Sequence, residues 1–209
     1  MFRDREEAGI QLADALESFR GQEVVVFALP RGGVVLEAQI AMKLDAPLDL
    51  VLTKKIGHPY NLEYAIGAIA EEGEMICDQF EVDSVDPVWF WKEVERTKAE
   101  LKRRRLEYLG NNKPRDLKGK IVIIVDDGIA TGLTMMAAVK AMEKRKAKQV
   151  IVAIPVTPYN ISRKLIAMGV DLVSLQIDRA YLGAVGAYYS DFRQVTDGEV
   201  VALLKHVHG

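Results

Sequence analysis

Five short runs of apolar residues recur along this chain of 209 residues, and most of them are followed by a stretch with helical periodicity. A continuous apolar run is typical of a strand buried on both faces, as in a parallel sheet that helices cover. Strands that alternate with helices favour an α/β fold. We therefore predict a central, mostly parallel five-stranded sheet flanked by helices, with strands at 23–29, 48–55, 120–126, 149–156 and 170–177.

Helices are expected before, between and after these strands. An amphipathic helix over 2–20 places five apolar residues near one face: Phe2, Ile10, Ala13, Leu16 and Phe19. The connecting helices are predicted at 32–44, 133–146 and about 158–168. The last helix begins near Thr196, because Thr196 and Glu199 have the spacing of a capping box.

One connection is longer than this alternation requires. The segment from Lys55 to Lys120 far exceeds a single crossover helix. Its first part resembles a hairpin with a turn at 71–74, and its second part resembles a charged helix over 84–109. We interpret the whole chain, 1–209, as a single domain with an inserted hairpin-plus-helix appendage at about 56–118.

Composition excludes several classes of protein. Lysine and arginine number 28 and aspartate and glutamate 30, so a net charge of −2 gives no general attraction to nucleic acid or acidic membranes. The single cysteine, Cys77, excludes an internal disulfide framework and a cysteine-rich zinc site. The N-terminus is charged from its third residue and has no apolar core segment, so it does not resemble a signal peptide, and no apolar run is long enough to span a membrane. We expect a soluble cytoplasmic protein without a membrane partner.

The stretch VDDGIATGLT, over 125–134, sets Asp126 and Asp127 at the carboxyl end of a strand and directly before a Gly/Thr loop. Backbone amides in such a loop, together with the N-terminus of a helix, bind anions, whereas carboxylates repel them. A ligand with a phosphate at one end and a vicinal diol at the other satisfies both. Ribose 5-phosphate is such a ligand, with the phosphate on the loop and the 2- and 3-hydroxyls on the carboxylates.

The stretch IVIIVDDGIATGLT resembles the phosphoribosyl-pyrophosphate loop of the type I phosphoribosyltransferases. Its signature positions are Asp126, Asp127, Thr131, Gly132 and Thr134. Rival phosphate motifs are absent: the sequence has no P-loop, no G-x-G-x-x-G fingerprint and no Asp-x-Asp at this strand. The resemblance implies the type I phosphoribosyltransferase fold, a role in nucleotide salvage, and a ligand loop formed by Gly128, Ile129, Ala130, Thr131, Gly132, Leu133 and Thr134.

Two further stretches support the resemblance, which covers nearly the whole chain and is similar to a subgroup described only as predicted phosphoribosyltransferases. ALPRGGVV, over 28–35, corresponds to the pyrophosphate loop, in which Arg31 contacts phosphate oxygens and Gly32 and Gly33 allow close approach. The family pattern implies a cis peptide bond between Pro30 and Arg31. Lys54 and Lys55 stand at the end of the second predicted strand, and the residues alone leave open whether they meet pyrophosphate or are simply solvated.

The resemblance implies a reaction in which a nitrogen nucleophile displaces pyrophosphate from 5-phosphoribosyl 1-pyrophosphate. The expected catalytic residues are Asp126, Asp127, Arg31, Lys54 and Lys55. The carboxylates would stabilise positive charge on the sugar, and Mg²⁺ would assist pyrophosphate departure while contacting Asp126 and Asp127 only indirectly, through ribose hydroxyls or water.

The acceptor is less well defined. Enzymes of this family that act on 6-oxopurines carry an acidic residue where this chain has Ala130, which argues against a hypoxanthine or guanine acceptor. A small, nucleobase-like acceptor is expected near the stretch 178–192. Its aromatic residues could stack on a ring, although packing within the protein is favoured for two of them, Tyr188 and Phe192.

A second hypothesis comes from a different functional class. Some proteins of this fold sense phosphoribosyl pyrophosphate and bind nucleic acid or protein without catalysis. The stretch 92–120, with KRRR at 102–105, is a possible nucleic-acid surface. Spacings such as Glu100 to Arg104 favour a solvated helix with internal ion pairs. We therefore expect no nucleic-acid partner, and we expect a homodimer.

Overall fold

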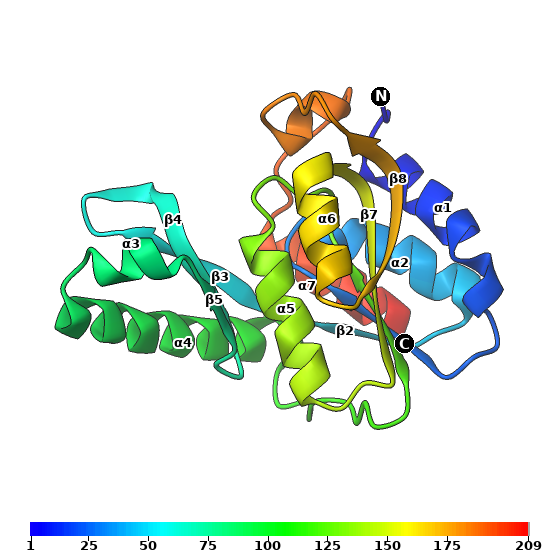
Figure 1. The fold of residues 1–209 in the computed structure, drawn as a ribbon. Coiled ribbons are helices and arrows are strands. Elements are labelled where there is room, and N and C mark those ends of the chain that lie inside the picture. The colour runs from blue at the N-terminus through cyan, green and yellow to red at the C-terminus, as the bar shows by residue number, and fades with distance from the viewer. Residues whose placement is uncertain (209) are drawn as a thin grey trace.

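A five-stranded parallel sheet forms the centre of the molecule, in the computed structural model that describes residues 1–208. The strand order is β2-β1-β6-β7-β8 (Figure 1). All four pairings are parallel, and the order reverses between β1 and β6. The predicted fold class is confirmed, and the strands span Val24–Ala28 (β1), Leu48–Leu50 (β2), Ile121–Val125 (β6), Gln149–Pro158 (β7) and Asp171–Asp178 (β8).

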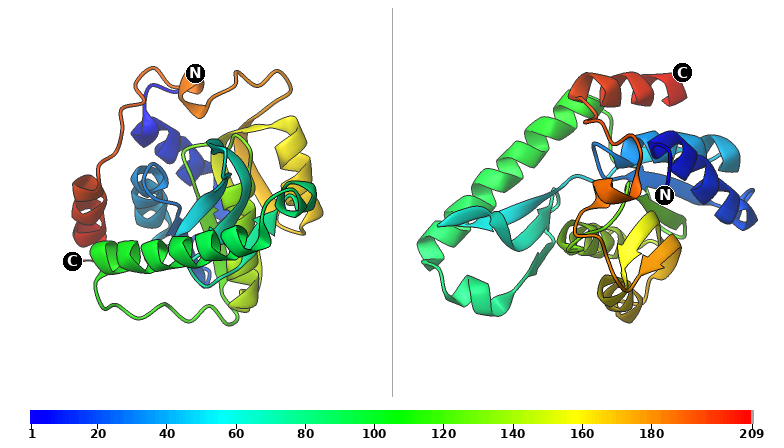
Figure 2. Two further views of the ribbon diagram at one scale, coloured as in Figure 1. Left: turned by 90° about the vertical axis from the view of Figure 1, so that its left-hand side faces the viewer. Right: turned by 90° about the horizontal axis from the view of Figure 1, so that it is seen from above.

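Helices cover both faces of this sheet because successive strand residues point to opposite sides. On β1, Val24 and Val26 pack in one cluster, whereas Val25 and Phe27 pack in the other. The first face is covered by α1 (Arg5–Ala15), α2 (Gly33–Leu44) and α7 (Asp197–His208). The second face is covered by α5 (Leu133–Lys144) and α6 (Tyr159–Ala167) (Figures 1 and 2).

The N-terminal helix is shorter than predicted. Asp4 caps α1 by accepting a hydrogen bond from the amide of Glu7, so Phe2 lies outside the helix and forms a bridge with Tyr189. After α1 a short 3₁₀ turn, η1 (Glu17–Phe19), replaces the last predicted turn. Ile10 is 47% exposed and was wrongly placed on the buried face. The face that is buried carries Arg5, Ala8, Gly9, Leu12 and Ala13.

The final helix begins as predicted. The amide of Thr196 donates to Glu199 Oε2 at 2.8 Å, and the amide of Glu199 donates to Thr196 Oγ1 at 3.2 Å. These two bonds form a capping box, which satisfies amides that a helix N-terminus leaves free.

The long insertion forms a lobe beside the main sheet, and we call residues 53–109 the inserted lobe (Figures 1 and 2). Its three antiparallel strands pair in the order β3-β4-β5. The predicted turn at 71–74 joins β4 to β5, but the hairpin between β3 and β4 was missed. The elements are β3 (Thr53–His58), β4 (Asn61–Ala70), β5 (Met75–Cys77), α3 (Gln79–Asp83) and α4 (Pro87–Leu109).

The predicted strand at 48–55 is in fact two strands in two different sheets. Leu48–Leu50 pairs with β1, and the amide of Val51 still donates to Ala28. Leu52 then accepts a hydrogen bond from Glu71, and the chain enters the inserted lobe. Lys54 and Lys55 therefore lie within β3 of the lobe and not at the end of a core strand.

Candidate active site

Two loops meet where β1 and β6 end side by side. We call residues 29–33 the Arg31 loop and residues 126–132 the acidic loop. The amide of Leu29 donates to the carbonyl of Val125 at 2.9 Å, which holds the two loops together. A Cβ added to Gly33 would lie 2.6 Å from that carbonyl, so glycine is required for this approach. The peptide bond between Pro30 and Arg31 is cis, as the resemblance implied.

Asp126 and Asp127 lie half-buried at the beginning of the acidic loop. One oxygen of Asp126, Oδ1, accepts a hydrogen bond from the amide of Asp127 at 2.8 Å. Burial raises the pKa of Asp126 well above its ordinary value, and the neighbouring Asp127 carboxylate raises it further. Burial also raises the pKa of Asp127, which the guanidinium of Arg5 opposes. The two carboxyls thus form a paired acidic group, as their positions in the sequence suggested.

Three residues that sequence reasoning did not assign to the acid pair hold Asp127 in place. Arg5 donates from Nε to Asp127 Oδ2 at 2.7 Å. The hydroxyl of Tyr189 donates to the carbonyl of Asp127 at 2.6 Å. Phe192 lies beneath the guanidinium of Arg5, with Cζ 3.8 Å from the ring centroid.

The end of the acidic loop and the first turn of α5 carry backbone amides without a protein acceptor. The amide of Ile129 is taken by Val156, and that of Met136 by Gly132. Within residues 1–208, the amides of residues 130–135 have no protein acceptor, and no side chain caps α5. Gly132 adopts φ +80°, a left-handed conformation that suits glycine, and it starts the helix. Thr131 is exposed beside these amides, so this part of the loop has the character of an anion site.

Arg31 has an exposed side chain that forms only a long ion pair, with Asp197. Its Nη1 lies 3.8 Å from Asp197 Oδ1, with both side chains substantially exposed. Such a pair contributes little stability, so Arg31 can turn towards a ligand. Asp197 in turn accepts a hydrogen bond from the hydroxyl of Tyr108 on α4.

The two lysines on β3 have different surroundings. Lys54 is paired with Glu100 on α4, which occupies its ammonium group. Lys55 points to the opposite face of the sheet, because neighbouring strand residues alternate. That face is the one against which α5 packs, and α5 begins at the acidic loop. Lys55 is exposed and, among the described residues, forms no ion pair, so it fits a ligand contact better than Lys54.

Most of the aromatic residues after β8 pack on the protein itself. Tyr188 is 3% exposed and donates to Asp178 Oδ2 at 2.7 Å. Tyr189 and Phe192 have ring centroids 5.0 Å apart. Tyr181 stacks on Tyr188, but its buried hydroxyl has no partner among the described residues.

Ala130, at the position where 6-oxopurine enzymes carry an acid, is exposed at the loop.

The basic helix α4 is largely neutralised by its own carboxylates. Arg96 pairs with Glu93 at 2.6 Å, and Arg103 pairs with Glu107 at 3.0 Å. The predicted pairing of Arg104 with Glu100 is also present, at 3.4 Å. The ion pairs expected of a solvated helix are therefore present on α4.

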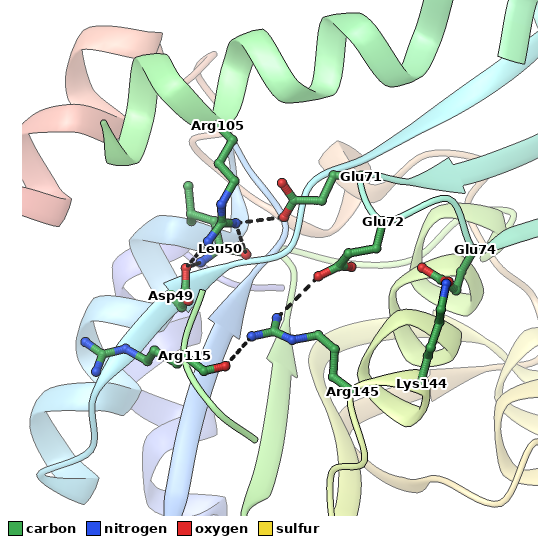
Figure 3. A network of polar contacts seen from close by, with 9 residues as sticks. All are labelled: Asp49, Leu50, Glu71, Glu72, Glu74, Arg105, Arg115, Lys144 and Arg145. Carbon is green, nitrogen blue, oxygen red and sulfur yellow. Dashed lines mark hydrogen bonds and ion pairs between the residues drawn. The ribbon is translucent and has the colours of Figure 1, made fainter. Parts of the chain in front are cut away.

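A polar network anchors the inserted lobe to the core (Figure 3). Arg105 of α4 donates to Glu71 Oε1 at 2.7 Å and lies 3.4 Å from Asp49 Oδ1 on β2. Arg145, directly after α5, lies 3.6 Å from Glu72 Oε1. Burial raises the pKa of Glu71 to about 7, although Arg105 lowers it. The lobe is therefore fixed both to the edge strand and to the end of α5.

The described residues contain no group of three or more His, Cys, Asp or Glu that could enclose a metal ion. Mg²⁺ commonly binds through one or two carboxylates, substrate phosphates and water. Asp126 and Asp127 supply two carboxyls near which an ion held by ligand oxygens and water could lie. From residue 1 to residue 208, no helix is long and apolar enough to cross a membrane.

Comparison with known sequences identifies relatives. A sequence model of the phosphoribosyl transferase domain matches residues 7–180. Two proteins of Mycobacterium tuberculosis, from strains CDC 1551 / Oshkosh and H37Rv, are each named provisionally as a phosphoribosyl transferase and are 38% identical over 210 residues. The match covers 100% of this chain and 47% of each relative, so the chain spans about half of their length.

Comparison with solved structures also identifies similar proteins. The crystal structure of TT1426 from Thermus thermophilus has a TM-score of 0.82 and 38% identity, covering 99% of this chain and 98% of that one. A Neisseria gonorrhoeae protein crystallised with bound ppGpp has a TM-score of 0.53 at 17% identity, with the same coverage, and it shows likeness of fold alone. With an acid pair beside free amides and a domain match over most of its length, the chain belongs to the phosphoribosyl transferase domain family.

Proposed function

We propose that this chain transfers ribose 5-phosphate from 5-phosphoribosyl 1-pyrophosphate to a nitrogen acceptor and releases pyrophosphate. The observation that carries the proposal is the acidic loop, in which an acid pair and a run of free amides lie within a few residues. The ligand has three charged or polar parts: the 5-phosphate, the ribose diol and the pyrophosphate. We assign a separate group of residues to each of them.

The 5-phosphate binds at the end of the acidic loop. The amides of residues 130–135 and the hydroxyl of Thr131 would donate to its oxygens. The positive end of the α5 dipole favours the anion at the same place.

The ribose diol binds at the acid pair. Asp127 Oδ2 is taken by Arg5, whereas Oδ1 accepts no N–H donor from the described residues and the neighbouring Asp126 carboxyl hydrogen-bonds to the same side chain. The ribose hydroxyls would donate to that oxygen and to Asp126. As pyrophosphate departs, positive charge grows on the sugar ring, and the two carboxylates stabilise it.

Pyrophosphate binds at the Arg31 loop. The amides of Arg31 and Gly32 donate to none of the described residues, and the guanidinium of Arg31 is weakly paired. Lys55 of the inserted lobe would add a second cation. Mg²⁺ would be held by the ligand oxygens near Asp126 and Asp127, and the chemistry it supplies is neutralisation of the leaving pyrophosphate.

The acceptor would enter between Ala130 and the stretch after β8. Tyr181 offers a ring and a hydroxyl without a partner there. The absence of an acid at 130 favours an acceptor other than a 6-oxopurine. A panel of nucleobases and amines, assayed for pyrophosphate release from phosphoribosyl pyrophosphate with Mg²⁺, tests this.

Calorimetry with phosphoribosyl pyrophosphate tests the ligand assignment. The double variant Asp126→Asn, Asp127→Asn should lose at least about tenfold in affinity and all transfer, because each amide keeps the shape but removes the charged acceptor. Asp45→Asn is the matched control, since Asp45 is exposed and adopts φ 52°, a conformation that asparagine tolerates. Unchanged affinity in the double variant would refute the ribose-diol assignment.

A regulator that senses the same ligand is the second candidate. The ion pairs along α4 favour a solvated helix, and a salt-dependent nucleic-acid binding assay tests this. Binding of phosphoribosyl pyrophosphate without pyrophosphate release from any acceptor would favour it. Because the gonococcal protein was solved with ppGpp, that nucleotide belongs in the competition assay. Sedimentation tests the expected homodimer in the same samples.

A further inference from the structure

Arg5 is a buried charged residue far from the acidic loop in sequence. It begins α1 and is 9% exposed. Its position falls on the buried stripe of the helix, among alanine, glycine and leucine. A guanidinium in such a place is retained only if its donors are satisfied.

The contacts of Arg5 fix it on three sides. Nε donates to Asp127 Oδ2 at 2.7 Å, and Nη1 donates to the carbonyl of Arg193 at 2.7 Å. The flat face lies 3.8 Å from the centroid of Phe192. A Cβ on Gly32 would come within 3.0 Å of Nε, so the Arg31 loop closes the fourth side.

This arrangement decides how Asp127 is presented. Oδ2 lies against Arg5 and Gly32: Nε donates to it at 2.7 Å, and a Cβ added to Gly32 would lie 1.9 Å from it. Oδ1 accepts no N–H donor among residues 1–208, and the carboxyl of Asp126 hydrogen-bonds to the Asp127 side chain, which raises the pKa of Asp126. The carboxylate therefore has one fixed oxygen and one available oxygen.

We propose that Arg5 is a positioning residue for ribose recognition: it holds Asp127 Oδ2 so that Oδ1 faces the ribose diol. The inference rests on the proposed function, since it concerns the same ligand. Arginine suits the task because its fork reaches a carboxylate and a carbonyl at once while its face stacks on a ring. Lysine has a single point of contact and cannot do all three.

A purely structural role makes a different prediction. If Arg5 only attached α1 to the sheet, its loss would weaken every ligand at the site equally through general loosening. If it positions Asp127, its loss weakens ligands with a ribose diol and spares those without one. Ribose 5-phosphate and inorganic phosphate separate the two cases, because phosphate needs only the loop amides.

The test is calorimetry of the full chain and its Arg5→Gln and Arg5→Lys variants with these two probes. Arg5→Gln should lose about tenfold or more for ribose 5-phosphate, and inorganic phosphate should change by less than about twofold. Arg5→Lys should recover part of the ribose 5-phosphate affinity. If Arg5→Gln does not fold, as thermal melting would show, Arg5→Lys supplies the same comparison. A loss of affinity confined to ribose 5-phosphate supports positioning, and an equal loss for both probes overturns it.

A double-mutant cycle completes the test. In an Asp127→Asn background, Arg5→Gln should cause no further loss of ribose 5-phosphate affinity, because the carboxylate it positions is gone. Additive losses, or equal losses for both probes, overturn the inference while leaving the proposed function intact. If the wild-type chain binds inorganic phosphate but not ribose 5-phosphate, the proposed function and this inference both fail.

Discussion

Replacement of Gly32 by alanine is the sharpest single test of how the two loops fit. A Cβ at Gly32 would lie 1.9 Å from Asp127 Oδ2 and 2.5 Å from its Cγ. Ordinary contact begins at 3.4 Å, so the carboxylate or the Arg31 loop must move. The carboxylate cannot withdraw freely, because Arg5 holds the same oxygen at 2.7 Å. Gly32→Ala therefore breaks either the ion pair or the contact between the loops.

The magnitude follows from those two possibilities. Overpacking of this kind costs about 1–3 kcal/mol. For a domain of this size each kcal/mol lowers Tm by about 2–4 °C, so Tm should fall by about 2–12 °C. A displaced Asp127 also loses a charge-assisted hydrogen bond to the ribose, which is worth about 1.5–3 kcal/mol, or roughly 10- to 150-fold in affinity.

The assay combines thermal melting with calorimetry of ribose 5-phosphate. Gly198→Ala is the matched control, since Gly198 lies in the first turn of α7 and a Cβ there meets nothing nearer than 4.0 Å. That control should keep its affinity and gain about 0.5–1 kcal/mol of stability. If Gly32→Ala instead keeps both Tm and affinity, the close approach of the two loops is wrong.

Substitutions of lysine, tyrosine and glutamate elsewhere test three other parts of the structure. Lys55→Met should weaken pyrophosphate binding, measured by calorimetry, and leave Tm unchanged. Lys54→Met should keep the affinity for pyrophosphate and lower Tm by at most about 4 °C. Loss of pyrophosphate affinity in Lys54→Met but not in Lys55→Met would contradict the assignment of the two lysines. Tyr189→Phe should lower Tm by about 2–4 °C, because it removes one buried hydrogen bond worth about 1 kcal/mol, and no change refutes that bond. Glu37 is a buried residue of α2, and burial raises the pKa of its carboxyl well above 4.5. The folded chain therefore keeps a proton that the unfolded chain releases. The free energy of unfolding falls as the pH rises above about 4.5, until the pKa of the folded state is passed. Glu37→Gln should therefore gain Tm over the wild type as the pH rises above about 5, and a difference that stays constant with pH would count against this.

The sheet could be predicted because its signal is local. Runs such as 120–126 and 149–156 are apolar throughout because helices cover both faces of the sheet. Such a run can be recognised in the sequence without knowing which segments it contacts. The same rule failed at 48–55, where a buried run continues into a strand of the inserted lobe. No change in hydrophobicity marks the junction, because Val51 and Leu52 are buried between the two sheets.

The site was predicted only as far as it is contiguous in sequence. The acidic loop and the Arg31 loop each carry their chemistry within a few residues. Arg5 is 122 residues from Asp127, and Tyr189 is 62 residues from it, so no local pattern connects them. One signal was available for Arg5: it occupies a stripe with Ala8, Gly9 and Leu12, where a charge is out of place without a partner.

The helix α5 connects the acidic loop to the inserted lobe. Its first residue, Leu133, follows the free amides of the acidic loop, and its last residue, Lys144, pairs with Glu74 in the turn of the inserted lobe. Arg145 continues the same attachment through Glu72 (Figure 3). The start of α5 is thus connected through one helix to the lobe that carries Lys55. Because Arg105 fixes the other side of the lobe to β2, the lobe is held at two points, and the position of Lys55 relative to the acidic loop is determined by the fold rather than by a flexible tether.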